Sequence, residues 1–461
     1  MTDRTQVVVG GTVAALTAAD AIAAEGRPVR LYLPRRGVGG GFLPLERGGR
    51  RLDLGMRVLE LHYEGTGSPP PVEDYRADDE GHRPFVALVD AWVRGLVGGD
   101  AVVPVDTPAS YLHGRLGPEL LLSSDLSGAA GLAGEEDARR MAAEAADAAR
   151  RSGDAGWLAA DQRGRLAQVS FDQASLHQHG RRFHDVFLDP FIRKVRPAGG
   201  SDVVAALRRK LWVPLFWPRT VAEALGGLPV GFVPERPLTV VRPGGMGAVV
   251  SALVDRLGTR GVEVIRYDRV GAVASHDAGV QIAFDDGSAV VAQRPVLGLS
   301  AGDLFRAAGI GLSTDRVRTV MAWVGVREDD VLARPGFVHV LDAAVPAYRV
   351  TPGERDAAGS WVFCVELAHD VRAEQAAATA AGVLRTLGLV REHAATEDLG
   401  VLAGPTFTAP TADNLRRHTV ALGRWHELGL PALVVAGAQA PFADSFNEQV
   451  VQGLQVAASA A

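Results

Sequence analysis

The apolar positions near the N-terminus fall into short segments separated by turns. Gln6–Val9 is an apolar run that ends at Gly10-Gly11. Val13–Ala24 combines good helix formers with apolar residues at helical spacing, and Gly26 stands where a C-terminal cap belongs. Val29–Leu33 is a second apolar run. This order predicts a strand, a tight turn, a helix and a strand, which is the opening of a dinucleotide-binding βαβ unit.

The phosphate-binding turn of this unit departs from the usual pattern. The motif G-x-G-x-x-G requires glycine at the positions that Gly10, Thr12 and Ala15 occupy. Ala15 still allows the helix to pack closely on the strand, but the β-branched side chain of Thr12 points to where a phosphate usually sits. The acid that normally binds the ribose hydroxyls is replaced by Leu33. Taken alone, the turn is a weak indication of a dinucleotide.

Further segments extend the pattern along the chain. A basic, glycine-rich loop at 35–42 follows the second strand, and the segment 50–57 contains Asp-Leu-Gly. The sequence Arg-Pro-Gly-Gly-Met-Gly at 242–247 opens a helix, and a later pair of apolar runs flanks an Asp-Gly turn typical of a hairpin. Near the end, a buried strand at 432–438 precedes a helix at 445–458.

These segments, in this order, resemble the flavoprotein superfamily of amine oxidases, protoporphyrinogen oxidases, carotenoid desaturases and UDP-galactopyranose mutases. The resemblance implies an α/β fold with a Rossmann-like FAD/NAD(P)-binding domain of the amine oxidase type. It also implies FAD as the cofactor, although Thr12, Leu33 and Ala438 depart from the family at three FAD contacts, so that we expect FAD to be bound weakly or lost. The residues that the resemblance places at the cofactor are Gly10, Gly11, Thr12, Arg36, Gly39, Gly40, Gly245, Met246, Val270, Gly437 and Asn447.

The resemblance also predicts how the chain divides. The dinucleotide-binding domain is expected to be discontinuous, assembled from 1–85, 232–305 and 413–461. The remaining segments, 86–231 and 306–412, are expected to form a second, mixed helical and sheet substrate domain that covers the flavin face. Within it, Phe171–Phe187, which contains three histidines, is expected to be helical.

Composition and charge narrow the function classes. The chain has 461 residues, and its net charge of −6 argues against broad binding to nucleic acid. Cys364 is the only cysteine, so an intramolecular disulfide and a multi-cysteine metal site are excluded, and it is expected to be buried and inert. No long uninterrupted apolar run predicts a membrane span, and the N-terminus does not read as a secretion signal, so we expect a cytoplasmic location.

Candidate chemistry comes from four residues outside the glycine motifs. Tyr348 and Arg349 present a phenol and a guanidinium that suit an anionic substrate, although a surface arginine is the plainer interpretation. Trp217 lies in an aromatic, proline-broken segment that either walls a pocket or packs between domains. Asn447 lies near the expected isoalloxazine position, where simple capping of the last helix is the alternative. The histidines around His177 complete no evident metal set, so no metal is expected.

The leading hypothesis is an FAD-dependent oxidoreductase of specialised metabolism, a biosynthetic enzyme that oxidises a C–N or C–C bond of a small-molecule substrate. Two alternatives stay open. One is a flavin-dependent mutase or isomerase without net redox. The other is an FAD-free descendant of the fold that acts as a non-redox enzyme or a ligand-binding protein.

Overall fold

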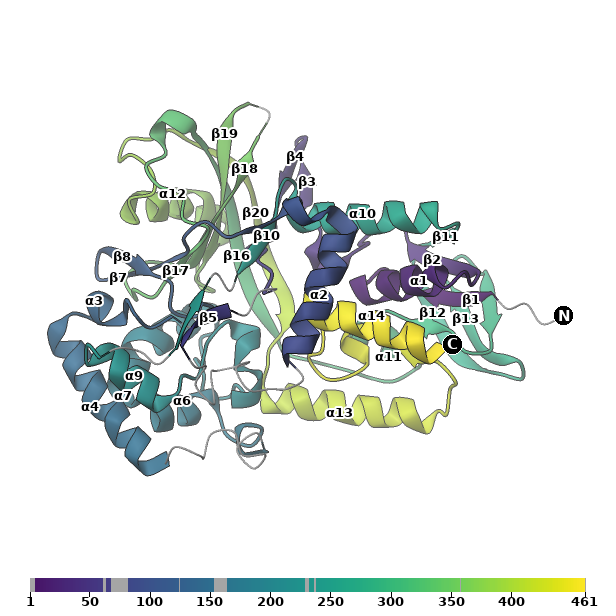
Figure 1. Ribbon diagram of the computed structural model, residues 1–461. Coiled ribbons are helices and arrows are strands. Elements are labelled where there is room, and N and C mark those ends of the chain that lie inside the picture. Colours follow the sequence, from purple (N-terminus) through teal and green to yellow (C-terminus); the bar gives the residue numbers. More distant parts are fainter. Residues whose placement is uncertain are drawn as a thin grey trace.

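The computed structural model describes residues 5–60, 64–67, 82–123, 125–152, 164–228, 232–235, 238–356 and 358–460 (Figure 1). Two sheets organise this part of the chain. A five-stranded parallel sheet lies at the end of the molecule that carries both termini, and a seven-stranded sheet lies beside it with a layer of helices. A mixed α/β fold of this kind confirms the predicted fold class.

The five-stranded sheet has the order β11-β2-β1-β15-β21, and every pairing in it is parallel. Along β1, side chains alternate between the two faces: Val8 packs into one core, while Val7 and Val9 pack into another. The strands are β1 (Gln6–Val9), β2 (Val29–Pro34), β11 (Glu263–Tyr267), β15 (Val296–Leu297) and β21 (Leu433–Val434).

Three helices cover the face of this sheet on which the Val8 side chain lies. Helix α1 packs against α10 and α14, and α2 in turn packs on both of those helices. Residues 86–97 of α2, which were expected outside the dinucleotide-binding segments, thus pack on helices from those segments. The hairpin strands and two more helices cover the opposite face. The elements are α1 (Val13–Ala24), α2 (His82–Val97), α10 (Gly245–Thr259), α14 (Phe446–Ala460), β12 (Val270–His276), β13 (Gly279–Phe284), β14 (Ala289–Ala292), α11 (Ala301–Ala307) and α13 (Ala412–Glu427).

The seven-stranded sheet has the order β20-β16-β19-β18-β17-β7-β8. Only the β17–β7 pair is parallel among its pairings. One face packs on α12, and the other faces the first domain. The elements are β7 (Ala109–Leu112), β8 (Arg115–Pro118), β16 (Arg316–Arg327), β17 (Val338–Val340), β18 (Ala347–Arg355), β19 (Ser360–Leu367), β20 (Thr396–Thr408) and α12 (Ala376–Thr386).

A helical layer with its own core completes the second half. Phe171–Phe187 is helical as expected, except that Gly180, with a φ of 82°, ends one helix, and a π-helical turn follows shortly after it. The elements are α3 (Ala129–Ala133), α4 (Glu135–Ser152), α6 (Phe171–His179), α7 (Arg181–Phe183), η3 (His184–Leu188), α8 (Asp189–Val195), η4 (Ala205–Leu211) and α9 (Pro218–Leu225).

Short elements join the larger layers. β6 pairs with β10, β3 with β4, and β5 with β9, all antiparallel. They span β3 (Leu45–Arg47), β4 (Arg50–Leu52), β5 (Glu64–Gly67), β6 (Val102–Pro104), β9 (Phe232–Glu235), β10 (Thr239–Val241), η1 (Gly40–Phe42), η2 (Gly99–Ala101), η5 (Glu328–Asp330), η6 (Ala373–Gln375) and η7 (Ala436–Ala438).

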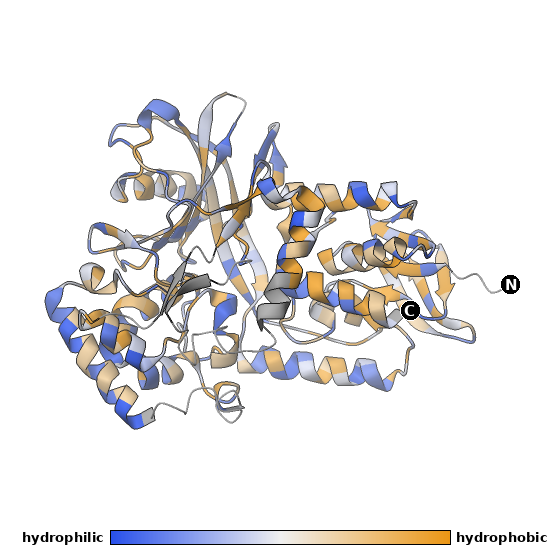
Figure 2. Ribbon diagram, in the orientation of Figure 1, coloured by the Kyte–Doolittle hydropathy of each residue, from blue (hydrophilic) through white to orange (hydrophobic). Residues whose placement is uncertain are grey.

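Apolar and polar positions alternate along the surface helices. In Figure 2, α4 and α13 show blue segments that alternate with tan or orange ones, and orange segments also occur on α2, α10 and α14. Among the described residues, none of the helices combines the length and the apolar character that crossing a membrane requires.

Candidate functional site

The first turn of the βαβ unit is built from the residues expected there. Gly10 takes a φ of 135°, and a Cβ at this position would collide with the Gly298 carbonyl. Thr12 is the N-cap of α1: its Oγ1 accepts a hydrogen bond from the Ala15 N–H at 3.3 Å and donates one to the Gly298 oxygen at 3.0 Å. The Thr12 side chain thus satisfies the backbone of the turn itself.

The loop after β2 closes over this turn. The Gly39 N–H donates to the Gly11 carbonyl at 2.6 Å, so the two segments are in direct contact. A Cβ on Gly11 would lie 2.7 Å from Cγ of Pro34, and both Gly10 and Gly11 are buried. Leu33, in the place of the ribose-binding acid, is 1% exposed and lies in the core. The turn is therefore packed closely against Pro34 and against the loop that carries Gly39.

At two helix N-termini near the expected cofactor position, backbone N–H groups already donate hydrogen bonds to side chains of the protein. The Ala14 N–H of α1 donates to the Gln449 side-chain oxygen at 3.4 Å. At the start of α10, the Gly244 N–H donates to the Glu354 carboxylate at 2.7 Å. A carboxylate held at a helix N-terminus takes the position that favours an anion and repels a second one. The residues present therefore do not fit a dinucleotide bound at these turns.

The other expected cofactor residues are dispersed. Arg36 and Gly40 are exposed, whereas Met246 and Val270 lie in two different cores. The predicted strand over 432–438 is shorter than expected, because β21 ends at 434 and Gly437 lies in the 3₁₀ turn that follows.

Two large cavities lie where the seven-stranded sheet faces the first domain. Residues two apart on a strand point to the same face. The segment 53–59 crosses this face, and Arg57 and Val58 line the cavities on both sides of it. The strand residues that share the face are Met321 and Trp323 of β16, Arg349 and Thr351 of β18, and Cys364 and Glu366 of β19.

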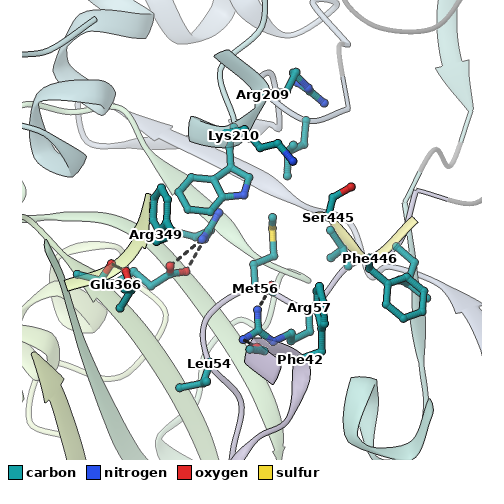
Figure 3. A pocket seen from close by; sticks show the side chains of 18 of the residues that line it. Phe42, Leu54, Met56, Arg57, Arg209, Lys210, Arg349, Glu366, Ser445 and Phe446 are labelled. Atoms are coloured by element: carbon teal, nitrogen blue, oxygen red, sulfur yellow. Dashed lines mark hydrogen bonds and ion pairs between the residues drawn. The ribbon is translucent and has the colours of Figure 1, made fainter. Parts of the chain in front are cut away.

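The first of the two cavities, which we call the interdomain cavity, encloses about 930 Å³, a size suited to a small organic ligand. In Figure 3, Arg349 and Glu366 lie on one side of it, and Phe446 lies on the side across from them. Its wall is mostly apolar and includes Leu54, Met56, Trp212, Met321, Phe407 and Phe446.

A buried ion pair forms the polar part of that wall. Arg349 binds Glu366 in a bidentate manner, through Nε to Oε2 and through Nη2 to Oε1 at 2.6 Å, and the two side chains are 2% and 1% exposed. The Tyr348 hydroxyl donates to the same carboxylate at 3.0 Å. Trp212, which adopts a φ of 59°, lies over the Arg349 guanidinium at 4.2 Å. Burial and the charge of Glu366 raise the pKa of Tyr348 well above its ordinary value, so the phenol stays protonated.

Among the described residues, Arg57 is the lining cation of this cavity that has no ion pair. Its Nη2 donates to the Gly41 carbonyl at 2.8 Å and its Nη1 to the Met56 carbonyl at 3.4 Å (Figure 3). Its Nε is buried and has no hydrogen-bond partner among the described residues. Burial lowers the pKa of Arg57, and the charges of Asp53 and Glu366 oppose that effect. A guanidinium nitrogen in this state is a ready partner for an anion.

The remaining lining cations are paired across the two halves of the molecule. Lys210 of η4 contacts the Glu448 carboxylate at 3.0 Å and the Asp444 carboxylate at 3.2 Å. Arg209 contacts Glu60 at 3.3 Å. Asn447, a predicted site residue, lines the cavity and donates to the Glu60 carbonyl at 3.1 Å.

The second cavity, of about 820 Å³, lies on the other side of Arg57. It is more polar, and its lining includes Arg51, Asp53, Gly245 and Glu354. Burial raises the pKa of Asp53. Cys364 also borders this cavity and is 4% exposed, which confirms the predicted burial. Burial raises the pKa of its thiol.

The structure brings together part of the predicted site. Tyr348, Arg349 and Asn447 line one cavity, while Trp217 is 6% exposed in the helical core and Trp212 takes the wall position. Sequence reasoning did not single out Arg57 or Glu366. Arg57 stands in the segment 50–57 that carries the family resemblance, which was the one signal for it; nothing in the sequence pattern of β19 marks Glu366.

Comparisons with known proteins agree with this architecture. No protein-family model matches the chain, and no curated protein matches it in sequence. The structure is similar to that of a reduced UDP-galactopyranose mutase, with a TM-score of 0.72 and 16% identity over 99% of this chain and 93% of the other. It is also similar to putrescine oxidase bound to putrescine (TM-score 0.57, 16% identity, 99% and 98% covered) and to a CLA-producing fatty acid isomerase from P. acnes (0.55, 13%, 99% and 98%).

The chain therefore shares its fold with a UDP-galactopyranose mutase, a putrescine oxidase and a fatty acid isomerase, and the predicted fold is confirmed. At these identities the likeness is one of fold, and one fold supports many functions.

Proposed function

We propose that this protein is an FAD-free descendant of the flavoprotein fold that binds a small amphipathic anion in the interdomain cavity. The observation that carries the proposal is the closed first turn, where the Gly39 N–H meets the Gly11 carbonyl directly. This closure favours the FAD-free alternative over the FAD-dependent oxidoreductase. Pro34, Leu33 and the capping side chain of Thr12 support it, because each takes space or hydrogen bonds that a bound dinucleotide would use.

The cavity itself indicates the class of ligand. Arg349, Lys210 and Arg209 are each matched by a carboxylate, so Arg57 is left as the lining guanidinium without one among the described residues. An anionic group of a ligand would complete the hydrogen bonds of Arg57 and balance its charge. The apolar wall beside it, with Met56 and Phe446, suits a hydrocarbon or aromatic portion.

An enzymatic role is supported by the named structural neighbours, which include a mutase, an oxidase and an isomerase. Without a redox cofactor, the chemistry would be proton transfer. Glu448 lines the cavity as the candidate base: burial disfavours its charge, but Lys210 and Ser445 lower the pKa of this carboxyl. Tyr348 supplies a protonated phenol on the opposite wall.

The experiment measures cofactor and ligand binding separately. The purified protein is expected to show no flavin absorbance and no saturable binding of added FAD. Thermal unfolding is then recorded with medium-chain and aromatic carboxylates, each beside the alcohol of the same skeleton. We expect at least one carboxylate to raise the unfolding temperature and its alcohol to have no effect, because only the anion pairs with Arg57.

Variants assign the effect to the cavity. Arg57→Gln should abolish the stabilisation by the carboxylate, whereas Arg139→Gln, which changes an exposed arginine of α4, should leave it unchanged. Stoichiometric yellow flavin in the isolated protein would refute the FAD-free proposal. Equal stabilisation by alcohols and carboxylates, or an unchanged response in Arg57→Gln, would refute the anion site.

A second candidate is the FAD-dependent oxidoreductase of specialised metabolism. The second cavity, of about 820 Å³, favours it, because this cavity offers space beside the turn at Gly244 and Gly245 that Glu354 now occupies. It requires the loop at 37–42 to open away from Gly11, so saturable FAD binding that protects this loop from proteolysis would support it.

A further inference from the structure

A cluster outside both cavities brings together three side chains with metal-binding atoms. Asp172 lies in the first turn of α6, His184 begins the π-helical turn η3, and Asp189 begins α8. One ligand atom from each lies within 4.8 Å of the others. Their spacing in the sequence indicates no metal motif, because they meet only where the break at Gly180 turns α6 against the continuous helical run of η3 and α8.

Two carboxylate oxygens of this cluster have lone pairs that accept no hydrogen bond from the described residues. Oδ1 of Asp172 and Oδ1 of Asp189 are both buried, and neither has a hydrogen-bond partner among the described residues. His184 is 5% exposed, and its Nε2 lies 3.7 Å from Asp172 Oδ1, which is too far for a hydrogen bond. Buried carboxylate oxygens without partners are costly, and a cation held between them removes that cost.

The surrounding residues hold the three side chains in place. Ser175 Oγ lies 3.0 Å from His184 Nδ1, where it can accept the ring proton and leave Nε2 free to ligate. The Arg193 Nε donates to the other oxygen of Asp189 at 2.7 Å, which orients that carboxylate. Gly200 closes the cluster, because a Cβ at this position would collide with Asp172 Oδ1.

We propose that Asp172, His184 and Asp189 form a binding site for one divalent cation, Zn²⁺ or Mn²⁺. One imidazole nitrogen and two carboxylate oxygens suit these ions better than Ca²⁺, which prefers an all-oxygen shell of six or more ligands. Bond lengths of about 2.0–2.2 Å place two ligand atoms at most about 4.4 Å apart, so a pair separated by as much as 4.8 Å must move closer when the ion binds. No cation is expected there from the sequence, and the site is independent of the function proposed above.

The site has a structural connection to the interdomain cavity. Ser175 Oγ also lies 3.2 Å from His179 Nδ1, and His179 Nε2 accepts the Phe216 N–H at 2.7 Å. This places one chain of hydrogen bonds between His184 and the segment 212–217, which carries Trp212 to the cavity wall. A cation would thus tie α6, η3 and α8 together behind that wall.

The experiment is a metal titration of the full chain without an affinity tag. After dialysis against EDTA, calorimetric titration with ZnCl₂ and MnCl₂ is expected to show one tight site, and MgCl₂ and CaCl₂ serve as comparators. Asp172→Asn, His184→Gln and Asp189→Asn should each weaken that site by at least about 10–100-fold, the loss typical even of an outer-shell change. Asp185→Asn, an exposed acid in the same turn, should leave it unchanged.

Three results would overturn the proposal. The first is the absence of a stoichiometric site in the wild-type titration, which does not depend on the folding of any variant. The second is equal affinity in Asp185→Asn and in the three ligand variants. The third is a higher unfolding temperature for Asp172→Asn or Asp189→Asn in EDTA together with no metal binding, because the two carboxylates would then be sharing a proton.

Discussion

The buried pair of Arg349 and Glu366 allows a test of whether water is excluded from this part of the cavity wall. Both side chains are at most 2% exposed, and their contact is bidentate. We consider Glu366→Gln, Arg349→Met and the double variant. Removing one partner of a buried ion pair typically costs about 3–5 kcal/mol, because the other charge is left without compensation.

The two single variants should differ in a defined order. Glu366→Gln leaves a guanidinium that cannot lose its proton, so its cost should fall at the upper end of that range. Arg349→Met leaves a carboxylate that can take up a proton and that keeps its hydrogen bond from Tyr348, so its cost should be smaller. The double variant removes both charges and should recover most of the loss.

The assay is calorimetric unfolding of the four proteins at pH 7. For a unit of 150–250 residues, about 2–4 °C corresponds to 1 kcal/mol, so Glu366→Gln should unfold at least about 6 °C below the wild type. Arg139→Gln, in an exposed helical pair, should shift unfolding by no more than a degree or two. If both single variants shift by as little as Arg139→Gln and the double variant equals their sum, the pair is not desolvated and the reasoning fails.

Three further outcomes follow from the packing and charge of particular residues. Leu33→Glu should lower the unfolding temperature without producing a yellow protein, because position 33 lies in the core; gain of flavin absorbance would contradict this. Gly298→Ala should destabilise the protein because its Cβ would collide with α1, whereas Gly302→Ala, with open space around it, should not; calorimetry of the two variants decides. Burial, with His184 and a nearby arginine, lowers the pKa of His179 from 6.5 to about 3. As the pH falls, His179 therefore takes up a proton at a higher pH in the unfolded chain than in the folded chain. The free energy of unfolding should then decrease from about pH 6.5 towards pH 3 by up to about 1.4 kcal/mol per pH unit. Urea unfolding at pH 7 and pH 5 should show a smaller fall in His179→Gln, and equal falls would refute the assignment.

Local elements were readable from the sequence because their signals are local. The helix predicted over Val13–Ala24 has those bounds in the structure, since its N-cap, its helix formers and Gly26 all act within a few residues. The Asp-Gly turn between β13 and β14 was likewise evident, because that dipeptide favours a tight hairpin turn on its own. The order of such elements was enough to predict the class of fold.

The site depended on contacts between distant parts of the chain. Arg349 was a candidate from its strand, but whether its charge is free or neutralised is decided by Glu366 on the neighbouring strand. Arg57 stands out because none of its packed neighbours supplies a carboxylate within ion-pair distance, among the residues described. Composition and periodicity carry no information on such pairings.

The sequence by itself determined the βαβ opening, the hairpin and the departures at Thr12 and Leu33. Only the tertiary structure decided the surroundings of these positions: the loop at 35–42 contacts the turn through Gly39, and the side chain of Leu33 lies in the core. It likewise decided that Asp172 meets two distant ligands across the break at Gly180. The physical reason is that backbone preferences act over a few residues, whereas burial, charge pairing and excluded volume are set by segments that meet only in the folded chain.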